Sequence, residues 1–350
     1  MEDQEDVMTT EAAVTGIFND TDKSENDTLF YPKHYMWDNK PLAPPLLTLL
    51  WSTLMIVGVL GNLGFIYVRA RVPYMRTLTN YYLVNLGIAD TIYLLAQVPG
   101  EIRNLYHDDA NSLWAIESYC LVMNTISYPC QYASLFTITV IAFERYFAIC
   151  QPFKMSGVYN TKSRALKFIA LTWVMGILVS LPFFFTCGPT TNALLSALLV
   201  VRLATFAPCM LIVAVLYILI GIQLNKRTSK PGGKDEQVRK ERKQVVRMLV
   251  VTAAVFFICL TPYQVYALYM SFVVMKKAPI VPFNVGLMFF SVNKTLIFLN
   301  SAANPAIYNA LSSKYRVAFK EAFGPLCFCL KSPPKHKYYY DNTNHTVVTM

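Results

Sequence analysis

Two short polar motifs interrupt or end long apolar runs of this sequence. The tripeptide Glu144-Arg145-Tyr146 places an acid beside an arginine at the end of one run, and the segment 304–308 (Asn-Pro-Ala-Ile-Tyr) lies inside another. Ionisable groups at a membrane boundary are costly, so they are usually functional. A proline inside a helix removes a backbone hydrogen bond and allows a kink. These residues therefore suggest a conformational switch built from ion pairs and hydrogen bonds, rather than covalent catalysis.

Two further ionisable residues point the same way. Asp90 and Lys294 also lie within apolar runs, where a charged group needs a partner, a bound ion or water. The sequence shows no catalytic triad, metal-ligand cluster or phosphate-binding loop. We therefore expect a binding and signalling role without enzymatic activity.

The elements that must position these residues are long apolar segments. Of the 350 residues, 55% are hydrophobic and only 15% are charged, whereas soluble proteins carry about 25% charged residues. Crossing a bilayer takes roughly 20 apolar residues. Because backbone polar groups cannot stay unpaired in lipid, continuous runs of this length predict helices, not the short alternating strands of a β-barrel. The predicted helices are about 46–69, 80–101, 117–143, 165–186, 194–224, 246–273 and 283–310.

The charge of the connecting segments predicts the orientation in the membrane. The connections after the first, third and fifth helices and the segment after the seventh are basic, most densely between Lys226 and Arg247. Lys and Arg are in excess on the cytoplasmic side, so we expect a multi-pass protein with its N-terminus outside and its C-terminus inside. The basic residues that give the net charge of +10 lie in short loops. A nucleic-acid partner is therefore not expected, because it would need the basic residues on one folded face.

The two ends of the chain differ from the apolar core. The first 40 residues hold ten acids and three lysines, a composition that predicts disorder. Asn19 and Asn26 begin N-x-[ST] sequences on the expected outer side and are predicted to be glycosylated. The expected organisation is a disordered extracellular tail over 1–44, a helix bundle over 45–311, an amphipathic helix over 312–325 and a cytoplasmic tail over 326–350.

The predicted amphipathic helix carries Tyr315, Phe319 and Phe323 on one face. This pattern is typical of a helix that lies on membrane lipid. Cys327 and Cys329 follow it and are candidates for palmitoylation, with unmodified thiols as the alternative.

One motif in each predicted helix resembles those of the rhodopsin-like (class A) G-protein-coupled receptors. A single motif of this kind is weak, but seven in order across residues 45–325 are specific. The resemblance implies an all-α bundle of seven transmembrane helices in the plasma membrane that activates a heterotrimeric G protein. It also implies arrestin and receptor kinases as partners. The motifs are Gly61-Asn62, the segment from Asn85 to Asp90, Glu144-Arg145-Tyr146, Trp173, Pro208, the segment from Cys259 to Pro262, and the segment from Asn304 to Tyr308.

The same resemblance implies roles for individual residues. The G-protein switch would comprise Glu144, Arg145, Tyr146, Asn304, Pro305 and Tyr308, in which Glu144 pairs with Arg145 in the inactive state. A sodium ion, as an allosteric ligand, would be held by Asp90, Ser134, Asn300 and Asn304, whose oxygens suit a hard cation. A purely hydrogen-bonded cluster is the alternative there, and a solvated charge pair is the alternative for Glu144 and Arg145. A disulfide is implied between Cys120 and Cys187, and no other cofactor is expected.

The ligand class follows from what the helices carry. Phe298 stands where an opsin needs its lysine, and Ser127 stands where an amine receptor needs its aspartate. Polar and aromatic groups suit a peptide, although some could face neighbouring helices instead. The candidate ligand-binding residues are Tyr128, Gln131, Lys294, Tyr263, Gln264, Arg202, Asn124 and Glu101. Finer resemblance is to receptors for thyrotropin-releasing hormone, in which residues matching Tyr128, Tyr263 and Lys294 line the site, and to those for ghrelin, neuromedin U and neurotensin. A neuropeptide ligand and coupling to a Gq-type protein are therefore expected.

Three departures from the family pattern keep other functions open. Leu260 replaces the tryptophan that relays ligand binding, Tyr217 lies one residue later than usual, and about ten residues remain for the second outer loop. A receptor that binds ligand without signalling, or a class A receptor for a non-peptide ligand, are the alternatives. A transporter is disfavoured because the two halves show no internal repeat.

Overall fold

Long helices make up nearly all of the chain that the structure describes. The computed structural model describes residues 43–106, 121–151, 162–184, 192–226, 233–275, 279, 282–324, 338–341 and 346–349. The long helices are α3 (Ala43–Arg71), α4 (Leu78–Tyr106), α6 (Tyr128–Cys150), α7 (Lys162–Phe184), α8 (Asn192–Lys226), α9 (Gly233–Val274) and α10 (Phe283–Leu311). A 3₁₀ turn, η1 (Pro73–Met75), joins α3 to α4, and a wide turn, η2 (Met123–Ser127), leads into α6. The predicted all-α bundle is confirmed.

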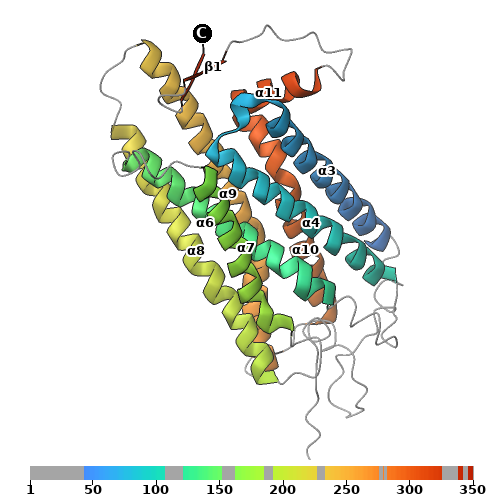
Figure 1. Cartoon of the computed structure of the whole chain (residues 1–350). Helices are drawn as coiled ribbons and strands as arrows, with labels where there is room; N and C mark the ends of the chain where they lie inside the picture. The colour runs from blue at the N-terminus through green and yellow to red at the C-terminus, as the bar shows by residue number, and fades with distance from the viewer. Residues whose placement is uncertain are drawn as a thin grey trace, which may run out of the picture.

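The helices form a closed ring with one helix outside it. Around the ring, α3 packs on α4, α4 on α6, α6 on α8, α8 on α9, α9 on α10, and α10 back on α3 (Figure 1). The seventh long helix, α7, lies against α6 and α4 from outside. This arrangement places α4, α6, α8, α9 and α10 around one interior, where their polar side chains can meet.

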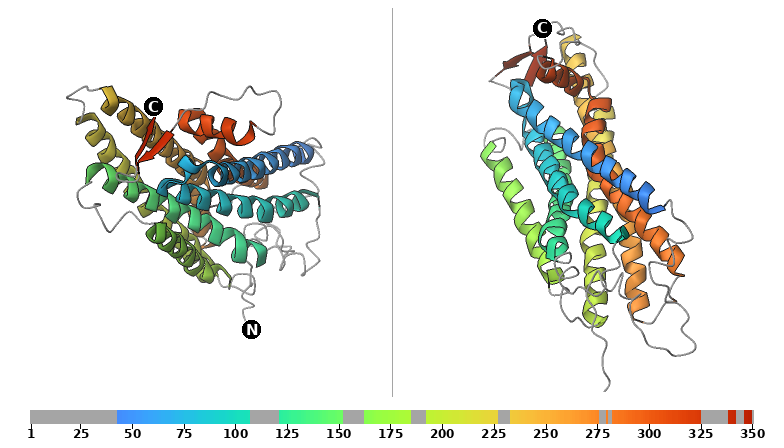
Figure 2. Two further views of the ribbon diagram at one scale, coloured as in Figure 1. Left: turned by 45° about the horizontal axis from the view of Figure 1, so that its top comes forward. Right: turned by 90° about the vertical axis from the view of Figure 1, so that its right-hand side faces the viewer.

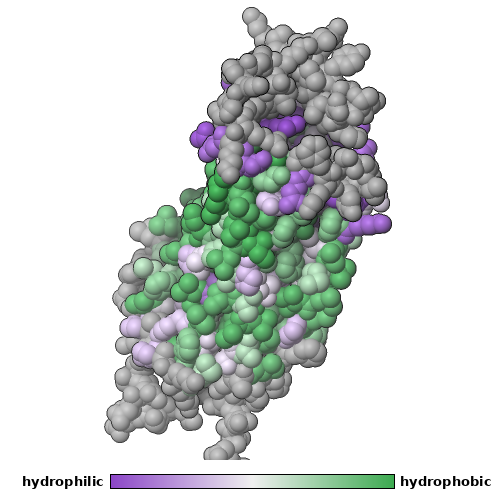
Figure 3. All heavy atoms as spheres, turned by 90° about the vertical axis from the view of Figure 1, so that its left-hand side faces the viewer, coloured by the Kyte–Doolittle hydropathy of each residue, from purple (hydrophilic) through white to green (hydrophobic). Residues whose placement is uncertain are grey.

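The outer surface of the bundle is apolar. Six of the described helices are long and apolar enough to cross a membrane, and α4 is not among them. On α8, Leu211, Val215 and Ile218 are exposed. Figure 3 shows hydrophobic residues dominating the middle of one face, with hydrophilic ones gathered toward the end where α11 lies. Apolar surface of this extent marks contact with lipid. The polar residues that set α4 apart are buried against other helices instead; they include Asn80, Asn85, Asp90, Gln97 and Glu101.

Small residues let α3 approach α10 closely. A Cβ atom at Gly58 would lie 3.0 Å from the Cβ of Ala302, and one at Gly61 would lie 3.1 Å from the ring of Pro305. In lipid the hydrophobic effect does not drive helices together, so membrane helices associate through close backbone packing of this kind. The Gly61-Asn62 motif therefore has a packing role as well as a polar one.

A shorter helix, α11 (Ser313–Phe323), follows α10 and confirms the predicted amphipathic helix. It lies across the end of the bundle instead of continuing α10 (Figure 2). Its buried face carries Tyr315, Ala318 and Ala322 and packs on α3. The ring of Phe323 lies 5.3 Å from that of Tyr67.

Three features of the fold differ from the sequence-based expectation. The Glu144-Arg145-Tyr146 motif does not end its helix, because α6 continues to Cys150. The basic segment expected as an inner loop is partly helical, since α9 begins at Gly233. The tail contains an unexpected antiparallel hairpin of β1 (Tyr338–Asp341) and β2 (Thr346–Thr349), in which Tyr338 pairs with Thr349. Tyr, Val and Thr, which favour strands, make up most of both segments.

Candidate functional site

The interior at the end where α4 finishes and α8 begins contains a buried ion pair. The Nζ atom of Lys294 on α10 pairs with Oε1 of Glu101 on α4, and their side chains are 3% and 2% exposed. One turn earlier on α4, Gln97 donates a hydrogen bond from Nε2 to the same carboxylate oxygen at 2.7 Å. Desolvating two charges is costly, and added hydrogen bonds of this kind offset the cost. Two predicted ligand-binding residues are thus brought together, each neutralising the other.

Three more predicted ligand-binding residues lie together: Arg202 of α8 and two tyrosines that contact it. The guanidinium carbon of Arg202 lies 4.7 Å from the ring centre of Tyr128 on α6 and 4.5 Å from that of Tyr263 on α9. Nη1 of Arg202 also donates a hydrogen bond to the phenol oxygen of Tyr263 at 3.3 Å. Arg202 is only 4% exposed. Cation–π contacts are strongest when desolvated, so this stacking holds the arginine in a fixed position between α6 and α9.

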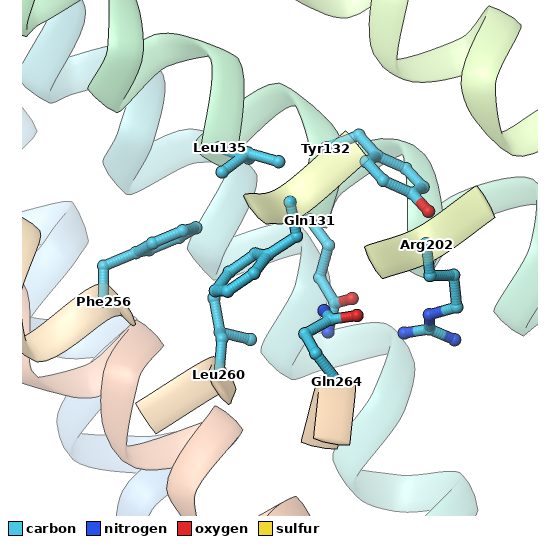
Figure 4. Close-up of a pocket in the computed structure, with 8 residues that line it drawn as sticks. Gln131, Tyr132, Leu135, Arg202, Phe256, Leu260 and Gln264 are labelled. Atoms are coloured by element: carbon cyan, nitrogen blue, oxygen red, sulfur yellow. The ribbon is translucent and has the colours of Figure 1, made fainter. Parts of the chain in front are cut away.

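A small hollow opens beside Arg202, with space for about one water molecule. Figure 4 shows the amide ends of Gln131 and Gln264 and the guanidinium of Arg202 directed toward the same space. Nε2 of Gln131 donates to the phenol of Tyr93 at 3.2 Å. Oε1 of Gln264 is buried without a hydrogen-bond partner among the described residues. The lining residues are Gln131, Tyr132, Leu135, Arg202, Phe206, Phe256, Leu260 and Gln264.

Leu260, which replaces the expected tryptophan, forms part of the hollow's apolar side. It is buried, and Phe206 and Phe256 line the hollow beside it. Phe257 makes edge-to-face contacts with both of these rings, each at 5.4 Å between centres. The aromatic contacts at this level therefore come from phenylalanines on α8 and α9. Sequence reasoning did not single them out, because phenylalanine in an apolar run carries no distinguishing signal.

Other polar groups near this level have unpartnered atoms, gave no signal in the sequence or are not described. Asn293 and Ser127 are buried with side-chain polar atoms that find no partner among the described residues. Asn293 was visible as a polar residue next to Lys294. Tyr93, whose phenol meets Gln131, gave no signal in the sequence because it lies in an apolar stretch of α4. Asn124 lies within η2, and its side chain is not described.

The predicted sodium-binding residues come together only in part. Nδ2 of Asn304 donates a hydrogen bond to Oδ2 of Asp90 at 2.7 Å. Ser134 and Asn300 are buried on α6 and α10, but among the described residues neither forms a hydrogen bond to Asp90. The oxygen-rich donor set suits a hard cation, whereas the observed amide contact is the hydrogen-bonded alternative. The sodium site therefore stays a prediction.

A second polar group joins three helices near the centre. Nε1 of Trp173 on α7 donates to Oδ1 of Asn85 on α4 at 2.8 Å, and Nδ2 of Asn85 donates to Thr137 on α6 at 2.8 Å. Both members of the Asn85–Trp173 pair belong to the sequence motifs. Their hydrogen bonds explain why α7, outside the ring, packs where it does.

The inner switch differs from the expected Glu144–Arg145 pair. Glu144 forms its ion pair with Arg164 of α7, and the phenol of Tyr82 donates to Glu144 at 3.5 Å. Arg145 instead donates a hydrogen bond to the hydroxyl of Thr79 on α4. Adjacent residues on a helix point in different directions, about 100° apart. Glu144 therefore meets α7 while Arg145 faces the interior.

Tyr308 of the predicted switch and two residues of α11 tie the ends of these helices to the bundle. Tyr308 is buried, with its ring 5.2 Å from that of Phe65 on α3. Tyr315 on α11 donates a hydrogen bond to Oδ1 of Asn80 on α4. Burial raises the pKa of the Tyr315 phenol above its ordinary value, so the donor stays protonated. Ser313 donates to Oε1 of Gln244 on α9 at 2.9 Å. These bonds close the end of the bundle at which α11 lies.

Two tyrosines near the switch, Tyr146 of α6 and Tyr217 of α8, pack against the same apolar cluster inside the bundle. Tyr146 is half-buried and accepts a hydrogen bond from Gln151 at 3.4 Å, just beyond its own helix. Tyr217, one residue later than the family pattern, still packs on the interior of the bundle beside Ile220 and Val246. The regular helix α8 accommodates this position without a break.

Several predicted sites lie outside the described residues and stay predictions. These are the disulfide of Cys120 and Cys187, glycosylation at Asn19 and Asn26, and palmitoylation at Cys327 and Cys329. In the described part of the chain, Cys130, Cys209 and Cys259 carry free thiols, and Sγ of Cys150 contacts the backbone oxygen of Leu219 at 3.9 Å.

Comparison with known families decides what kind of protein carries this arrangement. Residues 61–308, which include the pocket, the central polar groups and the switch, match the family described as 7 transmembrane receptor (rhodopsin family). The chain belongs to this family. It is therefore a multi-pass membrane receptor of the plasma membrane, and not an enzyme.

Individual relatives in this family are peptide receptors by name. The chain is 29% identical to neuromedin-U receptor 2 of Mus musculus over 330 residues, covering 86% of this chain and 82% of that protein. It is 30% identical to neuromedin-U receptor 2 of Rattus norvegicus, covering 82% and 77%. It is 31% identical to growth hormone secretagogue receptor type 1 of Sus scrofa, covering 81% and 83%. The expected resemblance to neuromedin U and ghrelin receptors is confirmed.

Proposed function

We propose that this receptor is activated by an extracellular peptide and transmits the signal to a heterotrimeric G protein of the Gq type. The observation that carries the proposal is the convergence of Tyr128, Arg202 and Tyr263 from three helices, beside the buried Lys294–Glu101 pair. Charged and hydrogen-bonding groups of this kind suit the amides and charged ends of a peptide. The peptide receptors among its relatives support the same class of ligand.

The signal would pass from this pocket to the opposite end of the bundle. Pro262 in α9 and Pro305 in α10 each interrupt the helical hydrogen bonding between the two ends. At the far end, Arg145 and the bonds that tie α11 to α4 and α9 hold a closed arrangement. Ligand binding would shift the equilibrium toward an arrangement in which α9 moves away and the G protein binds. In this proposal the pocket faces outward and α11 lies on the cytoplasmic side, where arrestin and receptor kinases also bind.

The proposal is tested by applying a library of neuropeptides to transfected cells and measuring intracellular calcium. A peptide should raise calcium in cells that express the receptor and not in untransfected cells. Arg145→Ala should abolish the response at unchanged surface expression and unchanged peptide binding. A calcium response that survives this substitution would contradict the proposed switch.

One observation favours a second candidate, a receptor that binds ligand without signalling. Leu260 occupies the position of the relay residue beside the hollow, and its branched aliphatic chain cannot swing as a large aromatic ring would. High-affinity peptide binding without activation of any G protein, in cells with normal surface expression, would establish this alternative over the first.

A further inference from the structure

The buried charges near the pocket do not balance. Among the described residues, this region contains two buried cations, Lys294 and Arg202, and one buried carboxylate, Glu101. The ion pair with Lys294 neutralises Glu101. In the described part of the chain no carboxylate is paired with Arg202, which contacts the rings of Tyr128, Tyr263 and Phe183 and forms hydrogen bonds with the two tyrosines. One positive charge is therefore left in a region that is shielded from water.

Aromatic rings offset only part of the cost of burying this charge. A cation–π contact is weaker than the hydration that a buried ion loses, and buried charges in proteins are normally paired with an opposite charge. Arginine carries five N–H donors, and two of them meet the phenol oxygens of Tyr263 and Tyr128. Further donors remain for an acceptor. The fork of a guanidinium matches a carboxylate better than any other common anion of a peptide.

The surroundings of Arg202 supply polar partners for such a group. Arg202 lines the hollow, and Figure 4 shows Gln131 and Gln264 directing their amide ends toward the same space. Gln264 is 7% exposed and its Oε1 is unpartnered among the described residues. The amide can turn to present its NH₂ group as a donor. Polar groups occupy one side of the hollow, whereas Leu135, Phe256 and Leu260 occupy the other.

We propose that Arg202 anchors a carboxylate of the ligand, assisted by the amides of Gln131 and Gln264. The ligand is thereby an acid: a peptide with a free C-terminal carboxylate or an Asp or Glu side chain placed at this depth. Lys294 is not the anion-binding residue, because Glu101 already neutralises it. The proposal rests on the proposed function only in taking the natural ligand to be a peptide.

A direct binding test needs no signalling. N-acetylglycine and N-acetylglycinamide differ only in the charge of the terminal group, and each is added to purified receptor up to its solubility limit while thermal unfolding is followed. The acid should raise the Tm of the wild-type receptor more than the amide does, and Arg202→Gln should remove the difference. Arg103→Gln, which removes an exposed arginine of α4, should leave the difference intact. Equal effects of acid and amide, or no effect of either, would overturn the proposal.

A cell assay separates the two sources of the carboxylate. Short peptides are made as free acids and as amides, and amidated peptides are made with Asp against Asn and with Glu against Gln. For the active series, neutralising the critical carboxylate should reduce calcium potency about 100-fold, comparable with the loss on breaking a buried charge pair. On Arg202→Gln the acid and neutral forms should differ less than about threefold, because the two changes remove the same interaction.

Arg202→Lys is a second variant, to be used if Arg202→Gln does not fold. It keeps the charge but loses the fork, so it should reach the cell surface and recover part of the preference for the acid form. If acid-specific stabilisation is present but no peptide raises calcium, the anion site stands and the proposed signalling fails. If active peptides are found and none depends on a carboxylate or on Arg202, signalling stands and this inference fails.

Discussion

The ion pair of Lys294 and Glu101 allows a sharp test of the energetics of the pocket. Both side chains are almost fully buried, and Gln97 donates a further hydrogen bond to the carboxylate. Lys294→Met would leave the buried carboxylate of Glu101 without the cation that neutralises it in the wild-type receptor. Breaking such a pair by removing one partner costs about 3–5 kcal/mol, and exposures of 3% and 2% leave little water to reduce this cost. Lys294→Met should therefore lower both the Tm of purified receptor and its surface expression.

The paired substitution distinguishes charge from packing. Replacing a whole buried pair with neutral groups of similar size is often close to neutral in stability, so Lys294→Met combined with Glu101→Gln should regain most of the lost stability. The coupling between the two positions in a double-mutant cycle should be about 3 kcal/mol. The measurement is thermal unfolding of the four receptors in one detergent, with surface expression as a second readout. If the double variant is as unstable as the sum of the single variants, the charges are not coupled and the reasoning is refuted.

Three further predictions concern packing and the switch end. Ser313→Ala removes the hydrogen bond from α11 to α9. Because a neutral hydrogen bond stabilises the closed arrangement by about 1 kcal/mol, basal calcium signalling should rise. Unchanged basal signalling would contradict a restraint at this position. Gly176→Leu should lower surface expression by forcing α7 away from α6, since even a Cβ atom would lie 2.9 Å from a backbone oxygen. The matched control Gly221→Leu, with open space around it, should express normally. Tyr315→Phe removes a buried hydrogen bond between α11 and α4 and should lower the Tm. The loss in Tm should be the same at pH 7 and pH 9, because burial raises the pKa of the phenol and keeps it protonated. A loss in Tm that appears only at neutral pH would contradict this prediction.

Much of the fold could be predicted because it follows from local composition. Long apolar runs give helices wherever lipid offers backbone groups no other partner. The spacing of aromatic residues in 312–325 gives α11 for a similar local reason. The third helix ends later than predicted because the charged pair Glu144 and Arg145 was taken as its boundary. Both side chains instead find partners on α7 and α4, which lets α6 continue to Cys150.

The pairing of the polar residues could not be predicted in the same way. Lys294 and Glu101 are 193 residues apart in the chain, and either could have faced a ligand. Glu144 sits beside Arg145 in the sequence, yet its partner is Arg164. Helix periodicity gives the face on which a residue lies, but not which residue of another helix lies opposite, because that depends on how helices are shifted and rotated against each other.

The sequence alone determined that this protein is a membrane-spanning bundle with one family motif in each helix, because hydropathy and motif spacing are properties of each segment by itself. It also indicated the peptide-receptor type that the comparisons bear out. Only the tertiary structure decided which of its buried charges are neutralised. Lys294 is paired with Glu101 across the bundle, while Arg202 lies between two tyrosines. That difference arises from distances between helices far apart in the chain.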